Sequence, residues 1–312
     1  MANQAKRCAV VGAANIDIGG FPAGMAVMGD SNPGRIRMSA GGVGRNIACN
    51  LARMGVETHM ITALGADGFA GVIREDCRRA GVDLDGALVF EDAASSAYLF
   101  IADAAGDMAL AVNDMDICAR LTPEALEGRI PMLNRMDAVV LDANLSPETL
   151  AFLASRVEVP VIADAVSAVK APKLKPILPR LFTVKPNAME AGALTGIPIT
   201  DRASAEAAAR ALRAMGANRA FITMGERGVC CAGDGQTLFI PGAPVRMVNA
   251  TGAGNAFTAA LAWATLRELD LSQSALAGLA AASIAVEGVQ TVNPDMSPSA
   301  LENRIRRIGN QK

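Results

Sequence analysis

A glycine-rich stretch, Val248–Phe257, has the residue types of an anion-binding loop. It reads V-N-A-T-G-A-G-N-A-F, with the hydroxyl of Thr251 and a Gly252–Gly254 step ahead of a small apolar run. Glycine lets the backbone turn its N–H groups inward. A helix beginning at Asn255 would point unpaired N–H groups and its positive dipole end at the same place. The stretch therefore predicts a phosphate-binding loop, with a simple glycine turn and Asn255 as N-cap as the alternative.

A second glycine-rich step and a carboxylate near the N-terminus predict a site for a sugar. Gly41–Asn46 (G-G-V-G-R-N) opens a helix, and the amide of Asn46 offers a donor and an acceptor in its first turn. Asp17 follows Asn15 by two residues at the end of a predicted strand, and its carboxylate suits the vicinal hydroxyls of a sugar. The alternatives are a tight turn for the glycines and a helix or turn cap for Asp17.

Two further turns at predicted strand ends carry polar groups for a nucleotide. Lys185–Glu190 (K-P-N-A-M-E) begins a helix, where Asn187 and Glu190 form either a capping box or a pair that faces phosphates and organises water around Mg²⁺. Thr223–Gly228 (T-M-G-E-R-G) is a glycine turn open to the close approach of a nucleotide. All these turns follow strand carboxyl ends, where open α/β sheets bind ligands.

The elements that must position these turns alternate along nearly the whole chain. Strands are predicted at 8–12, 58–63, 138–142, 159–164, 181–185, 220–223 and 229–232, and helices at 45–54, 68–80, 147–155, 189–195, 203–215, 256–266 and 273–287. Gly55 is expected to end the first helix as its C′ residue. This alternation predicts an α/β fold with helices on both faces of a mostly parallel sheet.

Two regions break the alternation and predict a small β-sheet lid. Residues 15–40 are rich in Gly, Pro and Asp and hold an alternating piece at Arg35–Met38, and residues 95–115 hold two alternating segments around a turn at 104–107. We expect both regions to lie over the ligand edge of the main sheet. Because no repeat, low-complexity tract or linker divides the chain, residues 1–312 are predicted to form one domain that carries this lid.

Composition excludes several classes of function. The chain has 312 residues, is 51% apolar and carries a net charge of −2, which predicts a soluble protein with a large core. The absence of a basic stripe, with one Trp and one Tyr, argues against nucleic-acid binding. No apolar run of about 18 residues indicates a membrane span, and the polar start Met1–Arg7 is no signal peptide. Six scattered cysteines and a single histidine, His59, predict buried thiols in a reducing cytoplasm rather than a metal cluster.

Taken in order, the motifs resemble the successive signatures of the ribokinase-type (phosphofructokinase B, PfkB) carbohydrate kinase family. They lie at 15–17, 41–46, 185–190, 223–228 and 249–257, so the resemblance covers essentially the whole chain. Within the family, segments 30–36, 41–48, 112–115, 164–168 and 249–254 are similar to the bacterial pseudouridine kinases. The resemblance implies a three-layer αβα ribokinase-like fold and MgATP-dependent phosphorylation of a primary hydroxyl. The closer similarity implies the 5′-hydroxyl of pseudouridine.

The resemblance also implies roles for individual residues. The substrate set is Asn15, Asp17, Ser31, Asn32, Gly41, Gly42, Asn46, Ser96 and Asn113. Of these, Asp17, Gly42 and Asn46 would hold the ribose, and the serines, Asn32 and Asn113 would read the base. The nucleotide set is Asn187, Thr223, Gly225, Gly228, Thr251, Gly252, Gly254, Ser283, Val286 and Asn293, with the last three near the adenine.

Transfer of the phosphoryl group would occur at the loop. Gly252, Ala253 and Gly254 would donate N–H groups to the transferring γ-phosphoryl group, and Glu190 would contact Mg²⁺ through water. Some members of the family also bind a monovalent cation such as K⁺ beside this loop, a point that the sequence leaves open.

One position departs from the family pattern. The family has an aspartate that takes the proton from the attacking hydroxyl where this chain has Asn255. An amide cannot act as a base, and loss of a general base typically costs about 10²–10⁴ in rate, although the anion loop and Mg²⁺ would still function. We interpret Asn255 as a substitution introduced to trap a substrate complex, because the other motif positions are intact. A natural low-activity or binding-only relative is the alternative.

The sequence therefore predicts an ATP-dependent pseudouridine kinase of the cytoplasm, impaired by Asn255. The alternatives are another kinase of the same family, acting on ribose, uridine, inosine or adenosine, and a non-catalytic nucleoside-binding protein that uses the same pocket as a sensor. The expected partners are the nucleoside and ATP, with neither a nucleic acid nor a membrane. Because the edges of an exposed lid suit pairing with a second lid, we also predict a homodimer.

Overall fold

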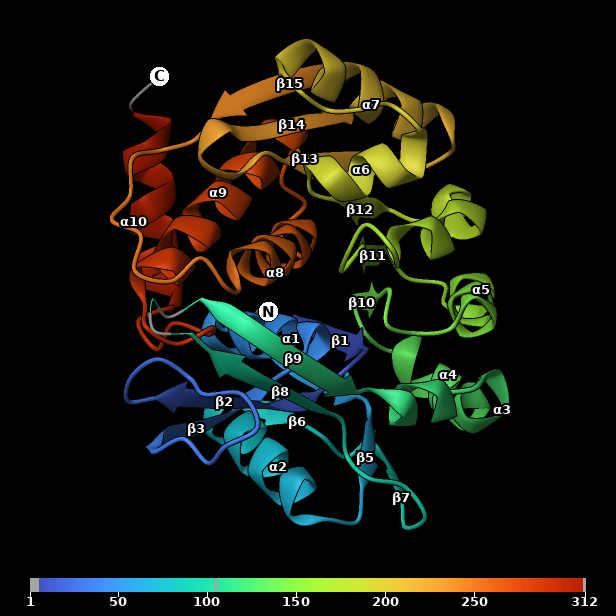
Figure 1. Ribbon diagram of the computed structural model, residues 1–312. Coiled ribbons are helices and arrows are strands. Elements are labelled where there is room, and N and C mark those ends of the chain that lie inside the picture. Colours follow the sequence, from blue (N-terminus) through green and yellow to red (C-terminus); the bar gives the residue numbers. More distant parts are fainter. Residues whose placement is uncertain (1–5, 104, 106, 311–312) are drawn as a thin grey trace.

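A large twisted sheet forms the middle layer of the molecule (Figure 1). The computed structural model describes residues 6–103, 105 and 107–310, so the polar start of the chain and part of the turn at 104–107 lie outside the described residues. The nine strands are ordered β15-β14-β13-β12-β11-β10-β1-β4-β6. They are β1 (Arg7–Val11), β4 (Glu57–Ile61), β6 (Val82–Asp83), β10 (Ala138–Asp142), β11 (Val161–Asp164), β12 (Thr183–Lys185), β13 (Arg219–Thr223), β14 (Gly228–Gly233) and β15 (Gln236–Pro241).

Neighbouring strands from β6 to β13 are parallel, and only β14 and β15 join antiparallel. The mostly parallel sheet predicted from the sequence is therefore confirmed. The expected strand at 58–63 is divided, however: β4 ends at Ile61, and β5 (Ala63–Gly65) pairs with β7 (Leu88–Phe90) in a separate two-stranded sheet.

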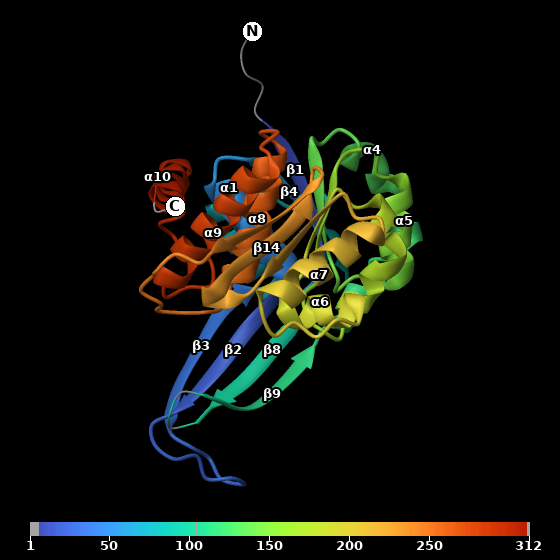
Figure 2. The ribbon, with the colours of Figure 1, turned by 90° about the horizontal axis from the view of Figure 1, so that it is seen from above.

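Side chains of the central strands alternate between two apolar cores. Cys8 and Val10 of β1 face one core, and Ala9 and Val11 face the other. Helices cover both cores, as the doubly wound pattern predicts (Figure 2). The first core packs against α1 (Val43–Arg53), α2 (Gly68–Ala80), α8 (Ala253–Thr265), α9 (Leu271–Glu287) and α10 (Pro298–Gly309). The second packs against α3 (Pro123–Leu126), α4 (Ile130–Leu133), α5 (Pro147–Arg156), α6 (Ala188–Thr195), α7 (Arg202–Ala214) and the 3₁₀ segments at 116–120 and 171–180.

A second, four-stranded sheet extends away from this body (Figure 2). We call it the small sheet; its order is β3-β2-β8-β9, with β2 (Asn15–Pro22), β3 (Gly34–Gly41), β8 (Ala97–Ala102) and β9 (Met108–Asp114). Both regions expected to form a lid thus supply its strands. That this sheet acts as a lid stays a prediction.

Among the helices that begin earlier than the sequence predicts, two begin at a glycine of the predicted site. Helix α1 begins at Val43 instead of Arg45, and α8 begins at Ala253 instead of Ala256. In both cases a glycine with positive φ is the N-cap, Gly42 at 96° and Gly252 at 91°, so the chain enters the helix before the apolar pattern begins. Asn255 therefore lies inside the first turn of α8, and its interpretation as an N-cap is wrong.

Helix α10 and strand β15 were not predicted, although Ser297 caps α10 and Pro298 occupies its first turn, which are ordinary start signals.

Among the described residues, none of the helices combines the length and the apolarity that a membrane crossing requires.

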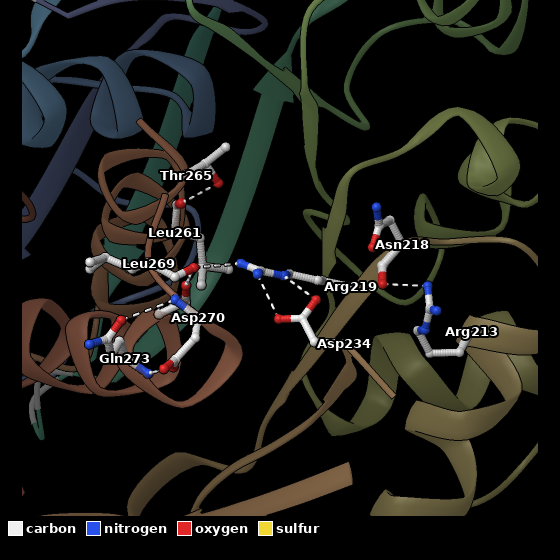
Figure 3. Close-up of polar contacts among 10 residues, drawn as sticks. Arg213, Asn218, Arg219, Asp234, Leu261, Thr265, Leu269, Asp270 and Gln273 are labelled. Atoms are coloured by element: carbon white, nitrogen blue, oxygen red, sulfur yellow. Dashed lines mark hydrogen bonds and ion pairs between the residues drawn. The ribbon is translucent and has the colours of Figure 1, made fainter. Parts of the chain in front are cut away.

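The start of strand β13 is tied to the C-terminal helices by Arg219 (Figure 3). This β13 side chain donates from Nε and Nη2 to the carboxylate of Asp234, at 3.1 and 2.6 Å, and from Nη1 to the carbonyl of Leu269 at 2.9 Å. Leu269 lies between α8 and α9, so the contact fixes the far end of α8 against the sheet. The opposite end of α8 carries the glycine-rich loop.

Candidate functional site

The glycine-rich loop precedes α8 and leaves the start of that helix without a side-chain cap from the described chain. Gly252 is required here, because its φ is 91° and a Cβ would overlap the carbonyl oxygen of Thr291. The loop is held by Asn249, whose Oδ1 accepts from the Thr251 N–H at 2.9 Å and whose Nδ2 donates to the Val289 carbonyl at 3.1 Å. The first-turn N–H groups of α8 and its dipole therefore suit an anion.

A buried ion pair supports the first turn of α8. Lys185, at the end of β12, lies with its Nζ 3.0 Å from Asp164 Oδ2 and donates to the Gly254 carbonyl at 3.3 Å. Thr258 donates from Oγ1 to the same Asp164 oxygen at 2.5 Å. The side chains of Lys185 and Asp164 are only 5% and 3% exposed, so this positive charge is held in a region of low dielectric beside the loop.

A chain of hydrogen bonds joins α1 to Asn255 on the other side of the loop. Arg45 donates from Nη1 to Asn46 Oδ1 at 2.8 Å, and Asn46 donates from Nδ2 to Asn255 Oδ1 at 3.3 Å. Asp76 of α2 accepts from Arg45 and completes the chain. The chain at the start of α1 can pass this close to the segment after β1 because Gly42 has no side chain; a Cβ there would overlap the Ala13 carbonyl.

Asp17 lies at the base of the small sheet. It is directly paired with Ser39 of β3 and with Tyr98 of β8, which in turn is paired with Asn113 of β9. Directly paired residues project to the same face of a sheet, so the four side chains form one row. Asp17 Oδ1 accepts from Asn15 Nδ2 at 2.7 Å, and Gly41 leaves room for its other oxygen.

Burial raises the pKa of Asp17 above its usual range, whereas the hydrogen bond from Asn15 and the charge of Arg45 act in the opposite direction. Its carboxylate makes no helix-capping bond among the described contacts.

An open cavity of about 1630 Å³ connects these parts. Asp17, Ser39 and Tyr98 line it from the small sheet, and Asn249 and Thr251 line it from the loop. It continues between α1, α2 and residues 289–294. Pockets for drug-sized ligands typically have about 300–1,000 Å³, so the cavity has room for a sugar or nucleoside beside the loop.

On the nucleotide side, Asn187 and Glu190 form the capping box that was one of the two predictions for this pair. Glu190 accepts from the Asn187 N–H and Nδ2 at 2.7 and 2.8 Å, and the Glu190 N–H donates to Asn187 Oδ1 at 2.9 Å. Burial raises the pKa of Glu190, and the charge of Lys185 lowers it. Each carboxylate oxygen keeps lone-pair capacity for a water, so the arrangement fits a water-mediated contact with Mg²⁺.

Thr223, at the end of β13, lies beside Asn187 through an isolated parallel bridge, and the Thr223 N–H donates to the Pro186 carbonyl at 3.0 Å. Gly225 lies in the turn that follows β13, and Gly228 is the first residue of β14. The structure thus gathers the 185–190 and 223–228 turns at one end of the sheet.

Several other predicted residues have polar groups that are engaged elsewhere. Ser31 and Asn32 lie in the exposed loop at the tip of the small sheet, where Asn32 bonds the backbone of Val27 and Asp30 (Figure 2). Ser96 is buried, with its hydroxyl 3.7 Å from the sulfur of Cys118. These placements leave Asn113, in the row of Asp17, as the base-reading candidate nearest the sugar site.

The three residues expected near the adenine all make contacts within the chain. Ser283 donates to the Ala280 carbonyl at 2.7 Å and accepts from Arg304 at 2.8 Å. Asn293 donates to the Ile284 carbonyl at 2.6 Å, and the Val286 carbonyl accepts from the Val248 and Asn249 N–H groups. Their role toward a nucleotide stays a prediction.

Lys185, Asp164 and Thr258 were not among the predicted site residues. All three are within motifs or helices that the sequence indicates, and Gly254 and Thr258 are four residues apart on one helix, so they share a face. The missing signal is the long-range contact. Asp164 and Thr258 are 94 positions apart and meet because α8 packs against β11, and the parallel pairing of β11 with β12 places Asp164 beside Lys185.

Comparisons with known proteins agree on the family. Residues 5–298 match the pfkB family carbohydrate kinases. The chain is 34% identical to the pseudouridine kinase of Escherichia coli K12 over 290 residues, which cover 92% of this chain and 93% of that protein. It is 35% identical to the uncharacterized sugar kinase YeiI of the same organism over 292 residues, 93% of this chain and 81% of the other. A solved carbohydrate kinase from Agrobacterium tumefaciens superposes with a TM-score of 0.87 at 31% identity, covering 96% and 97% of the two chains.

Proposed function

Because the chain belongs to the pfkB carbohydrate kinase family, we propose that it binds pseudouridine and transfers the γ-phosphoryl group of ATP to its 5′-hydroxyl. Kinases of this fold use ATP, with Mg²⁺ as its usual partner. The observation that carries the proposal is the Asn46–Asn255 hydrogen bond at the start of α8, together with one cavity that is lined by both Asp17 and the anion loop. The similarity to E. coli pseudouridine kinase over most of both chains supports the substrate.

Separate groups of residues bind the nucleoside and the phosphates of ATP in this proposal. Asp17 accepts hydrogen bonds from the ribose hydroxyls, and Asn46 holds the side chain at position 255 in place. The N–H groups at the start of α8 and the charge of Lys185 stabilise the negative charge of the transferring group. Mg²⁺ neutralises the nucleotide phosphates when bound, and Glu190 is placed to reach its waters.

Asn255 makes the transfer slow. Its Oδ1 accepts from Asn46 and, as an amide oxygen, is not basic enough to take a proton, whereas its Nδ2 group offers only donors to an incoming hydroxyl. A donor can hold an oxygen at this point, but it cannot take the proton. This same observation favours the second candidate, a nucleoside-binding protein without turnover. A reducing cytoplasm, which supplies ATP, suits either function and the six buried cysteines.

Pseudouridine should bind more tightly than uridine. As a C-glycoside, pseudouridine offers a second ring N–H, which can donate a hydrogen bond to a polar side chain such as Asn113. A pocket that makes this hydrogen bond rejects analogues that lack the second N–H. Isothermal titration with both nucleosides measures this without needing turnover. Equal affinities, or a preference for uridine, would remove the support for pseudouridine and leave a kinase of another specificity.

Asp17→Asn is the matched variant for that titration. It should weaken the binding of both nucleosides by roughly 1–3 kcal/mol, the scale of a charge-assisted hydrogen bond, and leave ATP binding unchanged. If it instead lowers the free energy of unfolding and leaves nucleoside affinity intact, Asp17 is a structural residue.

We also propose that the protein is a homodimer joined through the small sheet. The face opposite Asp17 is apolar: Ile36 and Met38 of β3, Leu99 of β8, and Leu110 and Val112 of β9 are between 43% and 80% exposed. The strand pairing makes these residues neighbours across the sheet. The sequence pointed to the sheet edges for pairing, but this face offers the larger apolar surface, and a self-complementary patch suits a two-fold dimer.

The double variant Ile36→Glu, Leu110→Glu should dissociate this dimer. Light scattering should give twice 32.1 kDa for the parent chain and 32.1 kDa for the variant, because two charges would be buried in an apolar contact. Val169→Glu, an exposed apolar position outside the small sheet, is the control and should leave the mass unchanged. A parent chain that is monomeric at micromolar concentration would refute the proposal.

A further inference from the structure

Aromatic side chains gather on the cavity side of the small sheet. The chain is poor in aromatics, with one Tyr, one Trp and nine Phe. The single tyrosine, Tyr98, and two of the phenylalanines, Phe21 and Phe100, line the cavity on this sheet. We call these three residues the aromatic strip. None of them has a role in the polar network of the loop.

The aromatic strip is a continuous surface. The rings of Tyr98 and Phe100 are 6.3 Å apart, and those of Phe100 and Phe21 are 5.7 Å apart in an edge-to-face arrangement. A side chain at Gly19 would overlap both phenylalanine rings, so a glycine at that position lets them meet across β2. All three side chains are half-buried and therefore keep part of their surface open.

The strip begins where the sugar site ends. Tyr98 is directly paired with Asp17, and Phe100 is directly paired with Gly19, one step of the same face further along β2. Phe21 follows at the next step, one residue before β2 ends at Pro22. Successive same-face positions are about 7 Å apart. A ligand whose hydroxyls bond Asp17 would therefore extend directly over these rings.

A cationic side chain closes the outer end of the strip. Arg37 lines the cavity, and its guanidinium carbon lies 5.2 Å from the centroid of the Phe21 ring. Arg37 is paired with Gly19, so it projects to the same face. Its planar group presents several N–H donors, which suits the carbonyl oxygens at the edge of a heterocycle.

We propose that Tyr98, Phe100 and Phe21 form a stacking platform for the planar base of a nucleoside, with Arg37 bonding the carbonyl edge of that base. This deepens the proposed function, on which it rests, by assigning the substrate to nucleosides rather than free sugars. A planar base can stack on one ring of the strip and contact the edges of its neighbours, since the ring planes are tilted by 40° and 88° to one another, whereas a free pentose has no flat face to stack. The platform therefore supplies affinity for the base, and Asp17 supplies affinity for the sugar.

The single tyrosine gives a direct test. Chain labelled with 3-fluorotyrosine carries its fluorine only at position 98, so the ¹⁹F resonance reports on this ring alone. Pseudouridine or uridine should shift the resonance in a saturable way, because the ring current of a stacked base acts on the fluorine. Ribose should leave it in place. A resonance that does not move at nucleoside saturation overturns the proposal.

Variants then separate the platform from the rest of the site. Phe100→Leu should weaken nucleoside binding on the order of 10- to 100-fold, the usual scale for loss of base stacking, and leave the dissociation constant of ribose unchanged. Phe239→Leu is the matched control, because Phe239 lies under Arg202 at 5.0 Å outside the cavity. Arg37→Met should weaken the binding of nucleosides with ring carbonyls and leave the binding of ribose unchanged.

Failure of the platform and failure of the kinase proposal look different. If Phe100→Leu weakens ribose and nucleosides equally, or neither, the platform is wrong while the sugar site stands. If no nucleoside or sugar binds and Asp17→Asn changes nothing, the proposed function itself is wrong.

Discussion

Asn255→Asp should raise kcat for ATP-dependent nucleoside phosphorylation by about 10²–10⁴. The carboxylate would replace the Asn255 amide at a point where Asn46 donates from 3.3 Å, so a ready-made hydrogen bond would orient it. The N–H groups at the start of α8 would keep it ionised. Its free oxygen would accept the proton of the 5′-hydroxyl during transfer, a task that the amide nitrogen cannot perform.

Single-turnover and steady-state phosphorylation assays measure this gain, and calorimetry should show nearly unchanged affinities for nucleoside and ATP. A higher rate with unchanged affinity is the signature of a group that acts mainly in the transition state. Asn303→Asp, an exposed amide on α10, is the control and should leave the rate unaltered. If Asn255→Asp binds both ligands and remains inactive, the nucleoside-binding protein becomes the better account of this chain.

The layered fold was predictable because its signals are local. Each central strand is a short apolar run buried on both faces, so the runs at 138–142 and 159–164 were recognisable without their partners. Helix α2 was predicted at its observed bounds, since Asp67 caps it and Gly81 ends it. Helix starts at glycine were misplaced, because a positive φ at Gly42 or Gly252 is a backbone property that the apolar pattern does not contain.

The polar loops were predictable as loops but not as contacts. The sequence indicated that residues 41–46 and 249–255 carry useful groups, and the structure joins them through Asn46 and Asn255, 209 positions apart. Asn32 shows the limit: its amide suits base recognition by type, but it closes its own loop at the tip of the small sheet. Strand register decides which polar side chains of the small sheet reach the ligand. Register depends on which strands pair, and no single segment of the sequence shows that pairing.

Register also explains why the aromatic strip was overlooked. Tyr98, Phe100 and Phe21 belong to two segments that are distant in the chain, and their shared face follows from the pairing of Asp17 with Tyr98. Once the pairing is known, one face of the small sheet is polar and aromatic toward the cavity and the other is apolar toward solvent. We therefore propose the first face for the ligand and the second for another copy of the chain.

Asp164→Asn should lower the free energy of unfolding by about 3–5 kcal/mol, because it leaves the buried ammonium of Lys185 without its counter-charge. The loss is large since both side chains are almost fully buried and Thr258 shares the same carboxylate oxygen. Chemical denaturation of the two proteins at neutral pH measures the difference. Phosphorylation or ligand binding should fall as well, because Lys185 would no longer be held at the Gly254 carbonyl.

Two further variants show whether burial of the pair is the cause. Asp234→Asn breaks a second ion pair, which joins Asp234 to Arg219 (Figure 3). The Asp234 side chain is 33% exposed, so its loss should lower the free energy of unfolding by no more than about 1 kcal/mol. Adding Lys185→Met to Asp164→Asn removes the unpaired charge and should recover part of the lost stability, which a purely additive effect would not do. If Asp164→Asn lowers the free energy of unfolding by no more than Asp234→Asn does, the Asp164–Lys185 ion pair does not stabilise the first turn of α8. The N–H groups of the loop would then be positioned by Gly252 and Asn249.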